Sequence, residues 1–517
     1  MYNIAIDFGT TNTIIGIYNL DVSHFEVFDI KKISKTIGSY RAIPTKIGYK
    51  NKSEYYIGNH PELLNLPDQH IFYKMKLYFS KFRSRPVKIG NDRIDHQQAA
   101  KNFLSLILDL ILAKYDKDEI DTFIITAPVI SFDKYRVFLS EICETKNIYN
   151  YQILDEPTAV ALGYDAIASP DYPYMVIDFG GGTLDVNVIR LNNAKKVNEV
   201  SILGKSGSNI GGSYIDNWLL KDFLQKQNLE LSDISHLKNE LLDKLENLKI
   251  EINNTGISEF FIEDKKNDFE MNYRLSLSEF EQILEANYFD ETIQETIDNA
   301  VESAIQSGIR KRDIKQIFLV GGSSLIKHFQ KIVANNFRDK ITISEPFSAV
   351  IKGGCKFISG SIVEDFLHHN YSIQHFNKNR GFYEYETIVP QKTKFPQNNV
   401  KQLIIATPFS GQEEIELKFF EVMTNIYNED KIEDITFDEN GNLIVIRDEL
   451  EQDKSRKVVP LNTNTRCFIT LNPPGIKSED RIKLTFHLNQ NRILLVDAID
   501  LKTNKKYYDK FEIARLK

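Results

Sequence analysis

Two short apolar runs lead into glycine-rich stretches, and strand-forming residues follow each of them. The first run covers Tyr2–Ile6 and the second Tyr174–Ile177, directly ahead of the sequences DFGTT and DFGGGT. β-Branched residues then continue over Thr13–Tyr18 and Leu184–Ile189. This pattern predicts two β-hairpins with glycine-rich tips. Because the same unit occurs twice, we expect a fold made of two related lobes.

Short apolar strands alternate with stretches of helical periodicity after each hairpin. Apolar side chains at helical spacing predict helices over residues 98–114, 132–145, 157–164, 218–227, 234–253 and 278–308. Short buried runs predict strands over residues 122–126, 151–154 and 317–320. This alternation is typical of an α/β domain, and it continues to about Gly360.

From about Phe382 the pattern changes to alternating strands without long helical stretches. Strands are predicted over residues 383–389, 400–406, 414–422 and 482–488. Turns are predicted at Asn440-Gly441, at Pro473-Pro474-Gly475 and at residues 489–491. We therefore predict an α/β domain over residues 1–360, a connection over 361–371 and a mostly β domain over 372–517.

Composition limits the class of protein. A length of 517 residues favours two or more domains, and 42% hydrophobic with 26% charged residues is ordinary for a soluble globular protein. A net charge of −8 without a long basic run disfavours nucleic acid as a partner. The cysteines, Cys143, Cys355 and Cys467, are too widely spaced to predict a disulfide framework or a zinc site. The start lacks a signal-peptide pattern, and the most apolar helical stretch is short and carries Asp109. We expect a cytoplasmic protein with no membrane partner.

The two hairpin tips carry residues suited to a polyphosphate. Glycine lets backbone N–H groups approach a phosphate closely, so two facing tips would grip a polyphosphate from both sides. Asp7 and Asp178 end the first strand of each hairpin and could hold a hydrated Mg²⁺. The hydroxyls of Thr10, Thr11 and Thr183 could bond phosphate oxygens.

A third candidate is Glu156, in the sequence Leu154-Asp155-Glu156-Pro157. The strand ends in carboxylates and a helix starts at the proline, which would point Glu156 into a cleft between the lobes, where it could orient an attacking water. The alternative is a first-turn carboxylate favoured by the helix dipole. The order of the elements, hairpin with Asp, strand with Glu-Pro, hairpin with Asp and strand with Gly-Gly, favours the functional interpretation.

Five segments then identify a family. IAIDFGTTNT, ILDEPTAVALGY, MVIDFGGGTLDV, NIGGSYID and FLVGGSSLI resemble, in this order, the nucleotide-site segments of the 70-kDa heat-shock chaperones, the DnaK-like proteins. The resemblance covers essentially residues 1–360, and GGGTLD and DEPTAVALGY separate this family from actins and sugar kinases. It implies an α/β, actin-like (ribonuclease H-like, duplicated) two-lobed nucleotide-binding domain, followed by an all-β sandwich domain.

The resemblance implies a role for each matching residue. Asp7 and Asp178 would bind Mg²⁺ through water, and Glu156, Asp178 and Thr183 would serve hydrolysis. The implied nucleotide-binding residues are Gly9, Thr10, Thr11, Asn12, Gly180, Gly181, Gly182, Gly211, Gly212, Glu246, Lys249, Asn253, Gly321, Gly322 and Ser323. ATP or ADP and Mg²⁺ are the implied cofactors, with K⁺ as a further candidate ion.

The family also has a catalytic lysine in a segment patterned like Phe72–Leu77. This chain offers both Lys74 and Lys76, and the residues that follow, LYFSKF, favour Lys76. The alternative is that both are solvated lysines on a helix.

The residues that contact adenine in the family differ here. Ile250 and Leu325 stand where the family has arginines, Asn253 where it has a serine, and Phe347 where it has an aspartate. Because apolar contacts replace cation–π and charged ones, we expect weaker nucleotide affinity or base selectivity.

The C-terminal third resembles the family more faintly. TIVPQKTKFP, LIIATPFS, IELKFFEV, ITLNPPGI and IKLTFHLNQNRILLVDAID match successive strands of its peptide-binding β-sandwich. By that match Leu403, Ala406 and Ile415 would line a peptide groove. The alternative is that they are ordinary core residues of the sandwich.

Three features depart from the family. The chain reaches Lys517 without the helical lid that follows the sandwich, so the resemblance is to a short form. The linker, a run of leucines in the family, is here Asp365–His369, and its histidines would make docking of the linker sensitive to pH. An inserted region, about residues 425–465, has no counterpart and is a candidate for binding a partner.

We therefore predict a DnaK-like chaperone that hydrolyses ATP slowly and couples its nucleotide state to binding of a polypeptide client by the β-sandwich. A J-domain co-chaperone and a nucleotide-exchange factor are implied partners. One alternative is a nucleotide-binding regulatory or scaffold protein with little hydrolysis, which the altered adenine contacts favour. Another is a sugar or metabolite kinase of the same superfamily, which the closer match to the chaperones disfavours.

Overall fold

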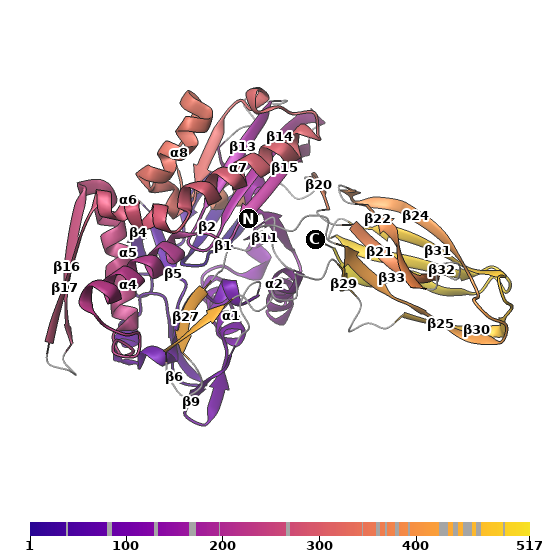
Figure 1. Cartoon of the computed structure of the whole chain (residues 1–517), viewed down its shortest axis with the longest axis horizontal. Coiled ribbons are helices and arrows are strands. Elements are labelled where there is room, and N and C mark those ends of the chain that lie inside the picture. Colours follow the sequence, from indigo (N-terminus) through magenta and orange to yellow (C-terminus); the bar gives the residue numbers. More distant parts are fainter. Residues whose placement is uncertain are drawn as a thin grey trace. The chain divides into compact units, whose positions relative to one another are not determined.

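A computed structural model of the chain divides it into two compact units (Figure 1). It describes residues 1–37, 40–79, 85–128, 133–164, 172–195, 197–264, 269–343, 345–357, 362–367, 370–377, 382–390, 393–422, 433–437, 443–447, 458–461, 467–489 and 492–516. Unit 1 consists of Met1–Val363 together with Asp430–Leu450, and unit 2 of Glu364–Glu429 together with Glu451–Lys517.

Unit 1 is built on two sheets, and the first contains the N-terminal hairpin. Its strands are β1 (Tyr2–Phe8), β2 (Asn12–Asn19), β3 (His24–Val27), β4 (Lys35–Ile37), β5 (Tyr40–Pro44), β11 (Ile120–Ala127) and β12 (Tyr151–Asp155). Strands β1 and β2 pair in antiparallel fashion, and β1 pairs in parallel with β11, which pairs in parallel with β12. The middle of β1 is buried as a continuous run, as expected for a strand covered on both faces.

The second sheet repeats this arrangement. Its strands in unit 1 are β13 (Pro173–Phe179), β14 (Leu184–Lys195), β15 (Val197–Ser208), β18 (Ile317–Val320) and β19 (Ile341–Thr342). Strands β13 and β14 form the hairpin, and β18 and β19 continue the sheet in parallel on the other side of β13. Both predicted hairpins are therefore confirmed, and each begins a sheet of the same topology.

Each sheet has its own hydrophobic core, and we call the two parts lobe 1 and lobe 2. Lobe 1 carries α1 (His96–Leu112), α2 (Asp133–Thr145), α3 (Glu156–Gly163) and α9 (Ala349–Lys356), and lobe 2 carries α4 (Gly212–Gln227), α5 (Lys238–Thr255), α6 (Leu277–Ala286), α7 (Phe289–Ile305) and α8 (Lys327–Phe337). Phe8 and Phe103 lie in the core of lobe 1, and Phe179 and Phe289 in that of lobe 2. Helix α3 contacts α9 and also β13, so it joins the lobes.

One predicted helix is two helices in the structure. Residues 278–308 were expected as a single helix, but α6 ends at Ala286 and α7 begins at Phe289. Tyr288 between them has a positive φ of 56°, which no helical residue adopts. The Asn287 side chain donates a hydrogen bond to the carbonyl of Ile283 over 2.8 Å, which gives a partner to a carbonyl group in the last turn of α6. The apolar spacing continues across this break, so periodicity alone does not reveal it.

Several short elements of unit 1 were not predicted. They are β6 (Ile47–Asn51), β7 (Glu54–Ile57), β8 (Ile71–Phe72), β9 (Val87–Ile89), β10 (Asp92–Ile94), the hairpin β16 (Ile257–Asp264) with β17 (Phe269–Ser276), and the single turns η1 (Pro61–Asn65), η2 (Asp68–His70), η3 (Met75–Phe79), η4 (Lys117–Glu119), η6 (Lys311–Asp313), η7 (Gly322–Leu325) and η8 (Arg338–Lys340). Most are too short for a period to emerge from their side chains.

Unit 2 is all β among its described residues. One sheet has the order β22 (Phe382–Val389), β21 (Asn370–Asn377), β26 (Phe419–Val422) and β29 (Val458–Pro460), and the other β24 (Gln397–Ala406), β31 (Asp480–Leu488), β32 (Ile493–Asp500) and β33 (Lys506–Arg515). β25 (Gln412–Leu417) pairs with β30 (Cys467–Gly475). The two four-stranded sheets share one core, in which the rings of Phe419 and Phe486 meet edge to face with centroids 6.0 Å apart.

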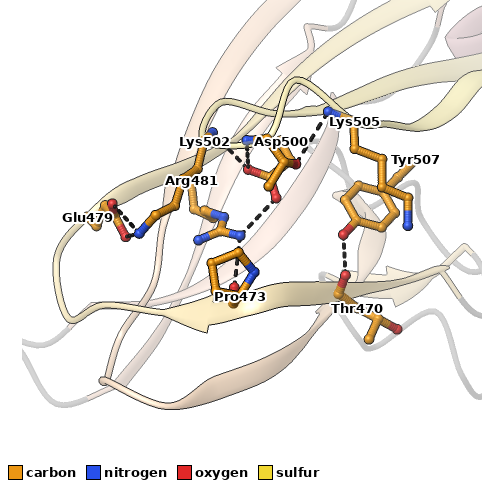
Figure 2. Close-up of polar contacts among 9 residues, drawn as sticks. Thr470, Pro473, Glu479, Arg481, Asp500, Lys502, Lys505 and Tyr507 are labelled. Carbon is orange, nitrogen blue, oxygen red and sulfur yellow. Dashed lines mark hydrogen bonds and ion pairs between the residues drawn. The ribbon is translucent and has the colours of Figure 1, made fainter.

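A buried arginine ties three strands of unit 2 together (Figure 2). Arg481 of β31 is fully buried, and its Nη2 donates to the Asp500 carboxylate and to the carbonyl of Pro473, each over 2.9 Å. Asp500 ends β32 and Pro473 belongs to β30. The hydrogen bonds of Arg481 offset part of the cost of removing the ion pair from water. The bond to the Pro473 carbonyl also fixes β30 against the sheet of β31 and β32.

Four predictions about the C-terminal third need correction. Residues 430–450 belong to unit 1, where β27 (Glu433–Phe437) and β28 (Leu443–Arg447) form a hairpin. The predicted connection contains the strand β20 (Ile362–Phe366), which pairs with β23 (Lys394–Phe395). Pro473-Pro474-Gly475 lies within β30 instead of forming a turn, and the strand expected over 414–422 is interrupted between β25 and β26. His368 and His369 of the linker, the Asn440-Gly441 tip and most of the inserted region lie outside the described residues.

Candidate functional site

The two glycine-rich tips face each other in unit 1. A Cβ atom on Gly182 would lie 2.7 Å from Thr10 Oγ1, and one on Gly181 would collide with Thr11 Oγ1. Within the second tip, the Gly180 N–H donates to the carbonyl of Thr183 over 3.0 Å, which closes the turn. Only glycine allows the loops to approach this closely, so the backbones of both tips border one space.

Glycines from two further segments, Gly211 and Gly321, also border this space. Gly211 at the start of α4 touches the backbone of Gly181 and Gly182, and the Ser213 hydroxyl donates to the carbonyl of Gly181 over 2.6 Å. Gly321 follows β18 with a φ of 80°, a conformation that favours glycine, and it lies against Asp178 and Phe179.

The segments after β18 and before α4 also meet. The Ser323 hydroxyl donates to the carbonyl of Gly180 over 2.8 Å, and Phe347 lies against Gly322. Gly212 at the start of α4 lies beside Ser323 and Lys249, so a side chain there would collide with the Ser323 hydroxyl. At the first tip, Gly9 lies against the backbone of Asn12. Four of the five sequence segments therefore surround one location.

Three carboxylates converge between the tips. Withdrawal from water raises the pKa of Asp7 to about 6; the Glu156 carboxylate adds to the rise, and the Lys76 ammonium and the Thr126 hydroxyl oppose it. Burial raises the pKa of Asp178 well above its usual range, with further contributions from Glu156, Asp185 and Asp7. Carboxylates in such proximity repel one another, and a cation among them would relieve the repulsion.

The two candidate lysines point to different places. Lys76 Nζ lies 3.1 Å from Glu156 Oε1, and both side chains are largely buried. Burial opposes the charge of Lys76, but the carboxylates of Glu156 and Asp7 outweigh it and raise its pKa, so Lys76 is an ammonium at neutral pH. Lys74 instead has a positive φ of 51°, and its charge acts on Asp216 of lobe 2.

Helix α5 contributes a lysine from lobe 2. Lys249 Nζ donates to Asp216 Oδ1 over 2.6 Å and to the carbonyl of Gly212 over 2.9 Å. Burial raises the pKa of Asp216 to about 6 despite the opposing Lys249, and Glu246, also on α5, adds to the rise. Lys249 thereby fixes the start of α4 beside the second tip.

The face expected to contact adenine is apolar in the structure. Asn253 of α5 donates to the carbonyl of Leu325 over 3.0 Å and accepts from the backbone N–H of Lys327 over 2.8 Å. These bonds hold α5 next to the turn η7. Ile250, 55% exposed, lies one helical turn before Asn253, and Leu325 is 38% exposed. Two apolar side chains therefore border this side of the site.

Sequence reasoning missed several polar residues that support the site. The Thr126 hydroxyl of β11 donates to Asp7 Oδ1 over 3.2 Å, and Asp185 of β14 contributes to the raised pKa of Asp178. Asp216 holds Lys249. Thr126 and Asp185 are polar positions in strands that are otherwise buried, and this is the signal that could have identified them.

The candidate groove residues of unit 2 have different environments. Ile415 is buried in the core of the unit, so the prediction that it lines an open groove is wrong. Its neighbours in β25, Glu414 and Glu416, are exposed. Leu403 is partly buried against the same core, and Ala406 is exposed.

The residues present fit a nucleotide with its metal ion. Glycine tips in contact provide close-approaching N–H groups, and the carboxylates of Asp7 and Asp178 suit a cation that keeps its waters. No group of three His, Cys, Asp or Glu side chains in the described part of the chain could hold a metal ion directly. Likewise, no helix among these residues is long and apolar enough to cross a bilayer.

Comparison with known proteins adds an independent result. The profile of the family described as "Hsp70 protein" matches residues 3–367. "Chaperone protein DnaK" of Thermotoga neapolitana is 24% identical, with 97% of this chain and 79% of that protein aligned. "Chaperone protein dnaK1" of Synechocystis sp. is 23% identical over 97% of this chain and 70% of that protein, and "Chaperone protein dnaK1" of Prochlorococcus marinus is 28% identical over 64% and 52%.

Proposed function

The chain belongs to the 70-kDa heat-shock protein family, and from this premise we propose that it is a chaperone-like ATPase that binds and hydrolyses Mg²⁺-ATP between the two lobes of unit 1. The observation that carries the proposal is the Lys76–Glu156 pair beside Asp7 and Asp178, with both glycine tips facing the same space. The family is an actin-like ATPase family, and the duplicated sheet topology of unit 1 agrees with that fold.

Each group of the site has a proposed task. The backbone N–H groups of the tips, with the hydroxyls of Thr10, Thr11 and Thr183, hold the phosphates. Lys76 places a buried positive charge where negative charge develops on the phosphate oxygens. Glu156 accepts a hydrogen bond from the attacking water and orients it, while Lys76 fixes the carboxylate. Mg²⁺, when bound, neutralises phosphate charge, and Asp7 and Asp178 would hold its waters.

Lobe 2 provides the nucleoside side of the proposed site. Lys249 of α5 bonds the carbonyl of Gly212, and Glu246 of the same helix acts on Asp216. Asn253 connects α5 to the turn after β18. The apolar Ile250 and Leu325 offer contacts to a base without a cation. This supports weaker selection for adenine than in relatives with arginines at these positions.

We further propose that unit 2 binds a polypeptide client as a β-sandwich. Two four-stranded antiparallel sheets with a shared core support this architecture. Ile404, Phe409 and Ile476 are each more than half exposed, and Thr407 bonds the loop of Ile476, so apolar side chains gather at one end of β24. A J-domain co-chaperone and an exchange factor are the proposed partners, and the cytoplasm the proposed location.

A fluorescent apolar peptide tests the coupling. We expect its affinity for the full chain to be several-fold weaker with ATP than with ADP, and Phe409→Asp to weaken binding in both states while leaving ATP binding intact. Lys477→Glu, a charge change in the neighbouring loop, is the control. Equal affinity with both nucleotides argues against coupling.

A second function has one specific observation in its favour. The exposed Ile250 and Leu325 remove charged contacts to the base, which suits a nucleotide-binding regulatory protein with little hydrolysis. Absence of single-turnover hydrolysis in a chain that binds ATP would favour this alternative.

A further inference from the structure

The hairpin β27–β28 stands in the sequence between two strands of unit 2 but packs in unit 1. Its neighbours in the chain, β26 and β29, pair with each other in unit 2. The segment Asp430–Leu450, which contains the hairpin and its flanking residues, belongs to unit 1. In Figure 1 the orange β27 lies among the purple elements of unit 1. The segment between β26 and β29 therefore contributes a structural element to the other unit.

One face of the hairpin is anchored in lobe 2. Ile435 of β27 is buried in the core of that lobe, and β27 contacts α4. Phe437 is also buried, and Lys238 Nζ at the start of α5 lies 5.0 Å from its ring centroid. Burial of two large apolar side chains shows that this is a packed interface and not a surface loop lying nearby.

The other face reaches lobe 1. Ile444 of β28 pairs with Thr436 across the hairpin, so it lies on the face opposite Ile435. It packs against a cluster formed by Leu77 and Tyr78 of η3 and Tyr214 of α4. Because η3 belongs to lobe 1 and α4 to lobe 2, the hairpin spans both lobes.

Leu77 connects the hairpin to the candidate site. Its Cδ2 lies 2.9 Å from the position of a Cβ on Gly182, beside Thr10 of the first tip, so Leu77 packs against the second glycine tip. Its neighbour in η3 is Lys76, whose ammonium contacts Glu156. Ile444 thus packs against the cluster that contains Leu77, and Leu77 in turn packs against Gly182.

We propose that the hairpin β27–β28 is a positioning element of the nucleotide site: Ile444, acting through Leu77, sets the placement of Lys76 and of the second glycine tip. The effect of the hairpin on catalysis rests on the proposed function, whereas its effect on the placement of η3 and of the second glycine tip does not. Side chains in contact transmit displacement because protein interiors are close-packed. Ile444 touches no reacting group, so its influence is indirect.

The chain offers matched variants for the test. Ile444→Asp places a charge against the cluster that contains Leu77, and Ile444→Val keeps the apolar contact. Val445→Asp puts the same charge at the adjacent position, which pairs with Ile435 and is 46% exposed. Hydrogen exchange in the full chain, read by mass spectrometry over residues 75–79 and 180–184, reports the two segments directly. We expect at least threefold faster exchange in both segments for Ile444→Asp only.

Kinetics and fluorescence complete the test. Ile444→Asp should lower kcat for ATP about tenfold with less than a threefold change in KM. Ile444→Val should keep the wild-type kcat. Trp218, the single tryptophan, packs against the same cluster, so its emission should shift to the red in Ile444→Asp and not in Val445→Asp.

The outcomes separate this proposal from the proposed function. Unchanged exchange in both segments overturns the positioning role, whether or not the wild type hydrolyses ATP. Faster exchange with an unchanged kcat in an active wild type also overturns it, because the contact is then only structural. Faster exchange in a wild type without hydrolysis supports the positioning of the segments and contradicts the ATPase assignment alone.

Discussion

The Asp68 carboxylate accepts a hydrogen bond from the backbone N–H of Asn239 over 2.9 Å, and the Asn239 side chain donates to the Asp68 carbonyl over 3.2 Å. Asn239 lies in the first turn of α5, whose own N-cap residue, Leu237, provides no side-chain bond. Helix α5 is therefore capped by a residue distant in sequence. The cap holds the helix that carries Lys249 and Asn253.

Removal of this cap should weaken unit 1. Asp68→Ala should lower the free energy of unfolding by about 1 kcal/mol, the usual cost of losing a helix cap. Urea denaturation followed by far-UV circular dichroism measures the change. Glu62→Ala, an exposed carboxylate in η1, should have little effect. Equal destabilisation by both variants would show that the cap contributes nothing specific.

Asp216 should give stability a particular dependence on pH. Its pKa is raised to about 6 in the folded protein, above the ordinary value of 3.8, so the folded state binds the proton more tightly than the unfolded state. The stabilisation from this group is complete below the unfolded pKa and is lost as pH rises through about 6.

The comparison with Asp216→Asn isolates this effect. Between pH 4.5 and 8, the wild type should lose stability relative to the variant, by at most about 3 kcal/mol. Unfolding free energies of both proteins across this range measure the difference. A difference that does not change with pH contradicts the raised pKa.

The sequence predicted the parts of the fold that depend on local pattern. Both hairpins follow from apolar runs that end at glycine-rich tips, and β1 with β2 and β13 with β14 occur as expected. The prediction of one helix over 278–308 was wrong because a single residue, Tyr288, takes a left-handed conformation that apolar spacing does not encode.

Placement of the site residues depended on long-range packing. The order of motifs brought Asp7, Glu156 and Asp178 to attention, but the contact of Thr126 with Asp7 joins residues 119 positions apart. Ile415 was expected in a groove and lies in the core, since one residue along a strand decides which face a side chain takes. The docking of the inserted hairpin on unit 1 has no local signal at all.

The apolar face next to η7 should limit nucleotide affinity. Ile250→Arg would introduce a guanidinium beside a bound base, and a cation–π contact contributes about 0.5–2 kcal/mol. We therefore expect two- to thirtyfold tighter binding of ATP by isothermal calorimetry. Ile257→Arg, an exposed position outside the site, is the control and should change nothing. Unchanged affinity in Ile250→Arg would remove Ile250 from the base-contacting face.

Single-turnover hydrolysis of ATP by the wild type, Lys76→Ala and Lys74→Ala tests the central claim most directly. Lys76 is paired with Glu156 beside Asp7, whereas Lys74 acts on Asp216. The account predicts that Lys76→Ala slows hydrolysis on the order of 100-fold or more while ATP still binds, and that Lys74→Ala slows it less than about threefold. Wild-type rates in Lys76→Ala, or the larger loss in Lys74→Ala, would contradict it.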